Sequence, residues 1–311
     1  MRLVANKIAI LGDLHGGWTR DDNSFFDRSD YDLLLFVGDL GSGTRRNGLQ
    51  IIRQLARLRV AALVLPGNND AEHLAHLSAE FSHQSGKLDI LRMFGGTSRK
   101  AVEPCGYSLH QLETQAGPLS LIASRPCSRG GPVLSYPEQL GRNYGVMTMD
   151  QSVRRLKGLV DEAPDRDLIF LAHNGPHGLG ENAADMWGRD FPIADTVTNR
   201  PGDWGDEDLS VAIAYARGRG KRVRAVIAGH MHRGAAGKLR PLLRCIDGTL
   251  YINAAVVPRI TGGKLGPVHH HVEMQTYADP ALPEAASGAD FEAASYRGLR
   301  IVERFRELED G

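Results

Sequence analysis

Carboxylate and imidazole side chains recur in short polar motifs that directly follow apolar runs of this 311-residue chain. The first motif places Asp13 and His15 two positions apart, just after the run Lys7–Leu11. If that run is an extended strand, its period of two puts both side chains on the same side of the chain. A carboxylate oxygen and an imidazole nitrogen aimed together suit a divalent metal ion. Taken alone, the pair equally fits a turn aspartate beside a surface histidine.

Later motifs supply more side chains of the same kind. Together the motifs hold two carboxylates, one amide oxygen and four imidazoles: Asp13, His15, Asp39, Asn68, His173, His230 and His232. This set overfills a single tetrahedral zinc site and suits two adjacent ions that share one carboxylate. Mixed nitrogen and oxygen donors suit manganese, iron or zinc. We therefore expect two divalent or mixed-valence metal ions as cofactors.

The apolar runs have the length and composition of strands that are buried on both faces of a sheet. The predicted strands are Lys7–Leu11, Tyr31–Val37, Val60–Leu65, Asp167–Ala172, Val223–Ala228 and Leu250–Ile252. Each of the first five is followed at once by glycine, proline and polar residues. The residues suited to chemistry therefore lie just after the strands.

Amphipathic segments between these runs predict helices. Thr44–Arg59 carries leucine and isoleucine at a spacing of three, with arginines outside. Val153–Val160 predicts a second helix before Pro164, and a third follows the acidic segment Asp206–Asp208 and ends near Gly218. Alternation of strands and helices predicts a mainly parallel sheet. Because the carboxyl ends of parallel strands share one edge, the polar motifs are expected to converge there.

The composition limits the classes of partner. Lysine plus arginine equals aspartate plus glutamate at 37 each, so the charge gives no support for nucleic-acid binding or a nuclease. The three cysteines, Cys105, Cys127 and Cys245, lack a C-x-x-C spacing, which argues against a disulfide framework or a thiolate zinc site. No apolar run approaches the roughly 20 residues of a spanning helix, and no signal-peptide core precedes Asp13. These features predict a cytoplasmic protein without membrane contact.

Five sequence blocks, in this order, closely resemble the signature of calcineurin-like metallophosphoesterases. The blocks are Gly12-Asp13-Leu14-His15, Gly38-Asp39, Gly67-Asn68-Asn69-Asp70, His173 after an apolar strand, and Gly229-His230-Met231-His232. The resemblance extends from about Ile8 to Arg259. It implies a four-layer α/β/β/α sandwich of two mixed sheets, with inserted loops over the site.

The resemblance also implies a role for each ligand. One group would hold the first metal ion: Asp13, His15 and His232. A second group would hold the second ion: Asn68, His173 and His230. Asp39 would bridge the two ions. The implied chemistry is attack on phosphorus by a bridging hydroxide, because two cations neutralise the phosphoester oxygens and lower the pKa of the water between them.

The third block departs from the family at the residue that follows its asparagine. Many members carry a histidine there, which helps to protonate the leaving group, whereas this chain carries Asn69, which cannot act as an acid. Asp70 and His177 are candidate replacements, although a loop histidine is often only a solvated bystander. His15 is another candidate, because in many members the first-block histidine lies close to the leaving group. Asn68 is expected to direct its amide NH₂ toward a phosphate oxygen.

Two further features concern the substrate. The segment Gly38–Gly43 lacks the additional Asp-Arg-Gly triplet of protein Ser/Thr phosphatases, which argues against that role. The segments Ser124–Gly131 and His173–Gly180 resemble a subgroup from bacteria, cyanobacteria and plants that includes DevT-like proteins, and this resemblance names no substrate. Arginine forks match phosphate oxygens, and ordinary surface arginine is the alternative. The candidate substrate contacts are Arg125, Arg129 and Asn174.

The predicted metallophosphoesterase domain covers residues 1–274, with insertions near 71–165 and 175–205. Residues 275–311 form a C-terminal extension in which only Leu299–Phe305 is expected to be ordered. The triplet His269–His271 is interpreted as the end of a strand rather than a metal site. The remaining single histidines are interpreted as surface residues on or near helices: His73, His76, His83 and His110.

The leading hypothesis is a metal-dependent phosphoric ester hydrolase, a phosphatase or phosphodiesterase, that acts on a small phosphorylated substrate. The alternative is a regulatory or scaffold protein of the same fold that binds metal with little turnover. The sequence carries no signal for the oligomeric state.

Overall fold

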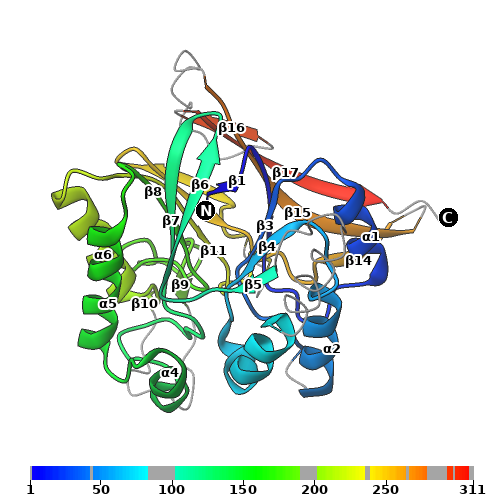
Figure 1. The fold of residues 1–311 in the computed structure, drawn as a ribbon, viewed down its shortest axis with the longest axis horizontal. Helices are drawn as coiled ribbons and strands as arrows, with labels where there is room; N and C mark the ends of the chain where they lie inside the picture. Colours follow the sequence, from blue (N-terminus) through cyan, green and yellow to red (C-terminus); the bar gives the residue numbers. More distant parts are fainter. Residues whose placement is uncertain are drawn as a thin grey trace, which may run out of the picture.

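The computed structural model describes residues 2–42, 45–82, 102–189, 202–234, 239–263, 266–278, 293–296 and 298–307. Two β-sheets pack against each other in the middle of the molecule, and helices cover the outer side of each sheet (Figure 1). This arrangement confirms the predicted α/β/β/α sandwich of two mixed sheets. His83 and residues 190–201 of the second predicted insertion lie outside the described residues.

The first sheet contains the strand that leads to Asp13. Its order is β16 (Ala293–Tyr296), β17 (Leu299–Glu307), β15 (Pro267–Thr276), β2 (Lys7–Leu11), β3 (Leu33–Phe36), β4 (Ala61–Val64) and β5 (Val102–Pro104). Strands β2 to β5 are parallel neighbours, whereas β15 runs antiparallel to β2. A short strand, β14 (Ile260–Gly262), pairs with β15.

The second sheet contains the strands that lead to the later histidines. Its order is β1 (Leu3–Val4), β6 (Ser108–Thr114), β7 (Gly117–Ala123), β8 (Asp167–Leu171), β11 (Arg222–Ala228), β13 (Thr249–Asn253) and β12 (Leu243–Ile246). Strands β7, β8, β11 and β13 are parallel. A separate pair, β9 (Gly188–Arg189) and β10 (Gly202–Asp203), lies in the second predicted insertion.

Side-chain alternation along the strands builds three apolar layers. In β2, Ile8 and Ile10 face the space between the sheets, while Ala9 and Leu11 face the outer helices. The first sheet is covered by α1 (Arg20–Arg28), α2 (Arg45–Leu55) and the helical residues 74–82. The second is covered by α4 (Pro137–Tyr144), α5 (Met149–Glu162) and α6 (Glu207–Gly218), which appear in green and yellow-green at the left of Figure 1. No helix among the described residues is long and apolar enough to cross a membrane.

All six strands predicted from the apolar runs form, and the three predicted helices correspond to α2, α5 and α6. The six strands are divided between the two sheets of the predicted sandwich, because β2, β3 and β4 belong to one sheet and β8, β11 and β13 to the other. Apolar runs specify a strand that is buried on both faces but not the sheet to which it belongs. The polar motifs therefore converge where two sheets meet.

One predicted insertion and the predicted C-terminal extension contribute strands to the two main sheets. Strands β5, β6 and β7 fall within the predicted insertion 71–165, yet each occupies a place in one of the sheets. The expected boundary at residue 274 falls inside β15, which pairs with β17 from Thr276 back to Val268. Residues 299–307 are thus part of the first sheet.

The histidine triplet is a buried part of β15 and not a strand end. His269 Nδ1 lies 2.8 Å from Asp22 Oδ1, and His271 Nε2 lies 2.7 Å from the Tyr31 hydroxyl. His270 Nε2 lies 2.8 Å from Glu303 Oε1. Two single histidines also differ from the surface interpretation: His73 is buried and His110 lies on β6, whereas His76 is exposed. Period and composition did not reveal these buried polar partners.

Asp22 is expected to be a major source of stability, although it belongs to neither candidate ligand group. It caps α1 and pairs with Arg259 at 2.6 Å, in a site where both side chains are buried. Burial opposes its ionisation, but His269 and Arg259 outweigh burial and hold its pKa well below the ordinary value of 3.8. Asp22→Asn should therefore cost about 3–5 kcal/mol in urea unfolding at pH 7, because it leaves a buried cation unpaired.

The pH dependence provides a second check on Asp22. A carboxylate with a lowered folded-state pKa stabilises fully above its unfolded pKa and loses this contribution as the pH falls. The difference between wild type and Asp22→Asn should therefore shrink below about pH 4. The exposed neighbour variant Asp21→Asn serves as the control and should match wild type. A cost for Asp22→Asn no larger than that of the control would contradict this assignment.

Candidate metal centre

Each predicted ligand lies in the loop that follows a strand, on the side where the two sheets meet. Asp13 and His15 follow β2, and the others follow β3, β4, β8 and β11 in turn: Asp39, Asn68, His173, His230 and His232. The loops are joined across the sheets, because the His230 N–H donates to both Asp13 oxygens at 3.1 and 3.0 Å. Within the first sheet, the His15 N–H donates to the Asp39 carbonyl at 2.8 Å. The structure thus brings together side chains from both sheets.

The glycines that precede these ligands permit the close approach of the loops. A Cβ on Gly229 would lie 2.1 Å from Asp13 Oδ2, and one on Gly67 would lie 2.3 Å from Asp39 Oδ1. A Cβ on Gly12 would lie 2.2 Å from the Ala254 carbonyl oxygen. The Gly-Asp, Gly-Asn and Gly-His pairs of the sequence therefore have a steric reason.

Four of the predicted ligands have a left-handed backbone. Their φ angles are 38° for Asp13, 43° for His15, 51° for Asp39 and 66° for His230. Residues with a side chain rarely adopt this region, and such strain concentrates at functional sites. The strain turns the side chains out of the strand direction and toward one another.

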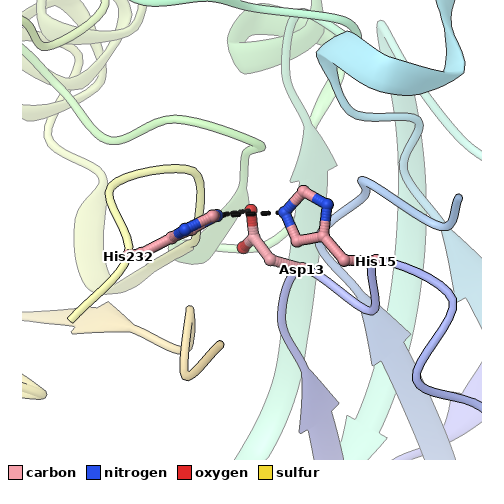
Figure 2. A group of neighbouring side chains, drawn as sticks. All are labelled: Asp13, His15 and His232. Atoms are coloured by element: carbon pink, nitrogen blue, oxygen red, sulfur yellow. Dashed lines mark hydrogen bonds and ion pairs between the residues drawn. The ribbon is translucent and has the colours of Figure 1, made fainter. Parts of the chain in front are cut away.

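The first ligand group contains Asp13, His15 and His232, whose ligand atoms all lie within 4.8 Å of one another. His15 Nε2 lies 3.0 Å from His232 Nε2, and His232 Nε2 lies 3.8 Å from Asp13 Oδ1. Figure 2 shows the Asp13 carboxylate beside the line that joins the two imidazole nitrogens. Two nitrogens and one oxygen therefore point into the same small space.

The second ligand group contains Asp39, His173 and His230, again with ligand atoms within 4.8 Å. Asn68 adjoins this group, because its Oδ1 lies 2.9 Å from His173 Nε2. Asp39 also reaches the first group: its Oδ1 lies 3.4 Å from His173 Nε2, and its Oδ2 lies 3.7 Å from His15 Nε2. The two oxygens of one carboxylate thus face different groups.

Hydrogen bonds to carbonyl oxygens select the free nitrogens of two imidazoles. His173 Nδ1 donates to the Val37 carbonyl at 2.6 Å, because a carbonyl only accepts, and this leaves the lone pair on Nε2. His230 Nε2 donates to the Arg129 carbonyl at 3.2 Å and leaves the lone pair on Nδ1. A backbone carbonyl on the far ring nitrogen is the usual way in which proteins orient a metal-binding histidine.

The electrostatics of the centre favour a bound cation. Burial lowers the pKa of His173 and His230 to about 3 and that of His232 to about 4, so these rings are neutral donors at physiological pH. Burial raises the pKa of Asp13 well above its ordinary value, and the negative charge of Asp39 adds to this effect. Buried carboxylates beside neutral imidazoles lack a compensating positive charge, which a metal ion would provide. The donor set therefore fits the predicted cofactors.

The proposed acids occupy different environments. Asp70 is fully buried and accepts from the backbone N–H of Gly67 at 2.8 Å and of Leu40 at 3.1 Å, which ties two ligand loops together. Burial and then the charge of Asp39 raise the pKa of Asp70 to about 7. The His177 ring is exposed and, within the described part of the chain, forms no hydrogen bond or ion pair with a ligand. Of the candidate acids, only His15 lies within a ligand group.

Two of the predicted substrate contacts are buried around Asp206, and the third is exposed. Arg125 is buried and pairs with Asp206 at 2.9 Å and with Asp208 at 3.0 Å, so its guanidinium is engaged inside the protein. Asn174 is buried as well and donates to the Trp204 carbonyl at 2.8 Å. Arg129 differs because its side chain is exposed while its carbonyl accepts from His230. The charge of an arginine and its position in the motif do not predict whether its side chain is buried, as in Arg125, or exposed, as in Arg129.

Arg125→Met should therefore lower stability and leave substrate contact unchanged. Removal of the guanidinium leaves Asp206 and Asp208 as buried carboxylates without their cation, with an expected cost of about 3–5 kcal/mol in urea unfolding. Arg142→Met is the matched control, because Arg142 forms an exposed ion pair with Glu138 on the surface of α4. This change should cost less than about 1 kcal/mol. Equal effects of the two changes would contradict the structural role of Arg125.

Sequence reasoning missed two residues that support the centre. The Trp204 indole N–H donates to the Arg129 carbonyl at 2.7 Å, which is the same oxygen that His230 contacts. Asp206, considered only as the start of a helix, accepts from Ser128 at 2.6 Å and from Asn174 at 3.2 Å. Trp204 lies at the end of the second predicted insertion and Asp206 directly after it, and the length of this insertion was the available signal.

A family model described as calcineurin-like phosphoesterase matches residues 6–234. A solved crystal structure is similar at 13% identity, covering 87% of this chain and 95% of that chain with a TM-score of 0.49. The search of curated proteins finds no match. Because the family model spans most of the chain and includes every predicted ligand, the chain belongs to the calcineurin-like phosphoesterase family, whose members are metal-dependent phosphoesterases.

Proposed function

We propose that the protein is a dinuclear metal-dependent phosphoesterase that hydrolyses a small phosphomonoester or phosphodiester. The supporting observation is the position of Asp39, whose Oδ1 and Oδ2 lie 3.4 Å and 3.7 Å from histidines of two different groups. A carboxylate that faces two groups of donors is the element that a pair of adjacent cations requires. The family match supports the reaction class, and the two groups support the number of ions.

Different residues of the chain would bind the two ions and position their shared ligand. One group would hold one ion, the second group with Asn68 would hold the other, and Asp39 would contact both. Bound divalent cations supply charge for the phosphoester oxygens and lower the pKa of water. The Asn69 backbone N–H and side-chain NH₂ donate to the two Asp39 oxygens at 2.8 and 2.9 Å, which orients this carboxylate. Asn69 thus positions Asp39 in place of donating a proton.

Asn68 would serve both an ion and the substrate. Its Oδ1 lies with the second group, and its Nδ2 donates to Asn69 Oδ1 at 3.2 Å. An amide offers an acceptor on one side and donors on the other. Asn68 would therefore hold a metal ion through oxygen and orient a phosphate oxygen through its NH₂.

His15 is the proposed source of help to the leaving group. Its Nε2 lies 3.0 Å from His232 and 3.7 Å from Asp39, within the first ligand group. If His15 assists the leaving group as well as binding metal, His15→Asn should slow a poor leaving group such as phenol about tenfold more than p-nitrophenol. Equal losses for the two esters would leave His15 as a ligand only.

The function is tested on the purified chain after chelation and reloading with manganese, iron or zinc. Hydrolysis of mono-p-nitrophenyl and bis-p-nitrophenyl phosphate should return with metal, and elemental analysis should find about two ions per chain. Two bound ions without turnover of either ester, or of a panel of phosphorylated metabolites, would favour the alternative of a regulatory or scaffold protein. Absence of bound metal would contradict both functions.

A further inference from the structure

The loop between β7 and α4 has an unusual backbone where it passes the metal centre. Cys127, Gly130, Gly131 and Tyr136 all have left-handed φ angles, of 59°, 76°, 75° and 54°. Glycine adopts this region freely, but a bulky aromatic residue such as Tyr136 is a genuine outlier there. Strain of this kind persists only where the surrounding structure enforces it, and it marks functional segments.

The loop is attached to ligand loops from both sheets. The Cys127 N–H donates to the Pro66 carbonyl at 2.8 Å, directly before the block that contains Asn68. The Arg129 carbonyl accepts from His230 Nε2 at 3.2 Å. A Cβ on Gly130 would lie 2.3 Å from the Trp204 carbonyl oxygen, so only glycine allows this approach. The backbone of Arg129 therefore lies at the second ligand group.

Tyr136 holds the Arg129 side chain at this place. Arg129 Nε donates to the Tyr136 hydroxyl at 2.9 Å, and the guanidinium carbon lies 4.8 Å from the centroid of the Tyr136 ring. The ring packs against Ala71, Leu74 and Cys127, just beyond Asn68 and Asn69. A stacked and hydrogen-bonded guanidinium loses less freedom when it binds an anion than a freely rotating one.

The electrostatics agree with a place at the rim of the centre. Burial is the largest cause that raises the pKa of the Tyr136 hydroxyl; Arg129 opposes this shift, and the charge of Asp39 adds to it. Tyr136 therefore keeps its proton at physiological pH.

We propose that Arg129 and Tyr136 form a pair that binds a terminal phosphate oxygen, with Tyr136 as the positioning residue for the guanidinium. The pair would contribute a charged donor, whereas the side-chain NH₂ of Asn69 is neutral and donates to Asp39. This inference rests on the proposed phosphoesterase function. A phosphomonoester has three terminal oxygens and a diester has two. If each of two bound cations took one terminal oxygen, a monoester would leave an oxygen for the pair and a diester would leave none. The substrate class is therefore a phosphomonoester.

The test compares Arg129→Ala and Tyr136→Phe with controls from the same region. Tyr144→Phe changes another ring of the same apolar cluster, and Arg142→Ala removes an exposed arginine of α4. Binding of inorganic phosphate to the metal-loaded protein is measured by calorimetry, and metal content is measured in parallel. Arg129→Ala should weaken phosphate binding about tenfold, as expected for a charge-assisted hydrogen bond. Tyr136→Phe should weaken it about threefold to tenfold.

The kinetic measurements separate positioning from folding. Both variants should raise KM for mono-p-nitrophenyl phosphate more than KM for the bis-ester, with metal content equal to wild type. The double variant should lose less than the product of the single losses, because Tyr136 acts through Arg129.

The outcomes distinguish this inference from the proposed function. In one outcome, the wild type binds phosphate while the affinities of both variants stay within about twofold of the wild-type affinity, which is the scatter expected for unrelated sites. This result would refute the Arg129–Tyr136 pair and leave the proposed function intact. Equal losses on monoester and diester would refute the monoester assignment. A metal-loaded wild type that neither binds phosphate nor cleaves either ester would refute the proposed function and the pair with it.

Discussion

Asp39→Asn should lower phosphoesterase turnover by more than about a hundredfold, which is the upper end of what loss of an outer-shell partner costs a metal site. Asp39 is the carboxylate that lies between the two ligand groups, with one oxygen toward His173 and the other toward His15. Asparagine keeps the volume but offers one oxygen in place of two and carries no charge. The side-chain NH₂ of Asn69 would also face a second NH₂ group, because it now donates to Asp39 Oδ2.

The same substitution should leave the metal-free protein at least as stable as wild type. Burial raises the pKa of Asp39, so the folded state binds more protons than the unfolded state above the ordinary carboxyl pKa. Stability from such a group decreases as the pH rises, and the cost is fully present once the folded carboxyl is ionised. Asparagine removes this cost. Thermal unfolding without metal should therefore be unchanged or higher, whereas the increase in Tm on adding manganese should be lost.

Asp32→Asn provides the matched control for this experiment. Asp32 accepts from the backbone N–H of Asn6 and Lys7 at 2.9 and 3.1 Å, at the end of the sheet away from the ligands. This control should keep turnover and the response to metal. If Asp39→Asn retained turnover at the level of Asp32→Asn, Asp39 would not connect the two groups.

The sequence predicted which side chains lie close together at the candidate metal centre better than it predicted their surroundings. Asp13, His15, Asp39, His173, His230 and His232 were identified because each follows an apolar run, and a parallel strand delivers its next residues to a defined edge. This rule depends only on local period and strand direction. It holds here even though the strands belong to two sheets, because the loops of the two sheets are hydrogen-bonded to each other, as between His230 and Asp13.

The residues around the ligands could not be predicted in this way. Arg125 and Arg129 are four positions apart in one loop, yet one is buried against Asp206 and Asp208 while the other is exposed. The difference arises from the left-handed turns of the loop and from contacts with Trp204, about 75 residues later. Long-range pairing of this kind has no period and no local composition.

The interpretation of the β15 histidines as a strand end was wrong for a related reason. His269 and His271 alternate on one face of a long strand, and each contacts a polar partner near the start of the chain, Asp22 and Tyr31. A buried imidazole is acceptable only with such a partner. The pairing of β15 with β2 joins distant parts of the chain and brings these histidines close to their partners. The triplet therefore looked like a strand end when its sequence was considered alone.

Gly229→Ala should weaken metal binding at least about tenfold, in the range found when support of a metal ligand is lost. The new Cβ would lie 2.1 Å from Asp13 Oδ2 and 2.7 Å from Val37 Cγ2, distances that no pair of unbonded atoms sustains. Asp13 is fully buried and cannot move into solvent. The substitution should also cost about 1–3 kcal/mol of stability, as overpacking of a filled interior does.

Gly234→Ala is the matched control, because a Cβ at that position meets nothing within 4 Å. Manganese titration and urea unfolding of both variants measure the two effects separately. Wild-type metal affinity in Gly229→Ala would show that the Asp13 position is not decisive for the first ligand group.

The loss of affinity should have a specific structural origin. The His230 N–H donates to both Asp13 oxygens, so the backbone after β11 holds the carboxylate that follows β2. A methyl group on Gly229 would push Asp13 away from this donor and from His232, whose Nε2 lies 3.8 Å from Asp13 Oδ1. The first block would then be separated from the last, although every ligand is still present. Asp13→Asn should consequently lower metal affinity in the wild-type background more than in Gly229→Ala, because the two changes disrupt the same interaction.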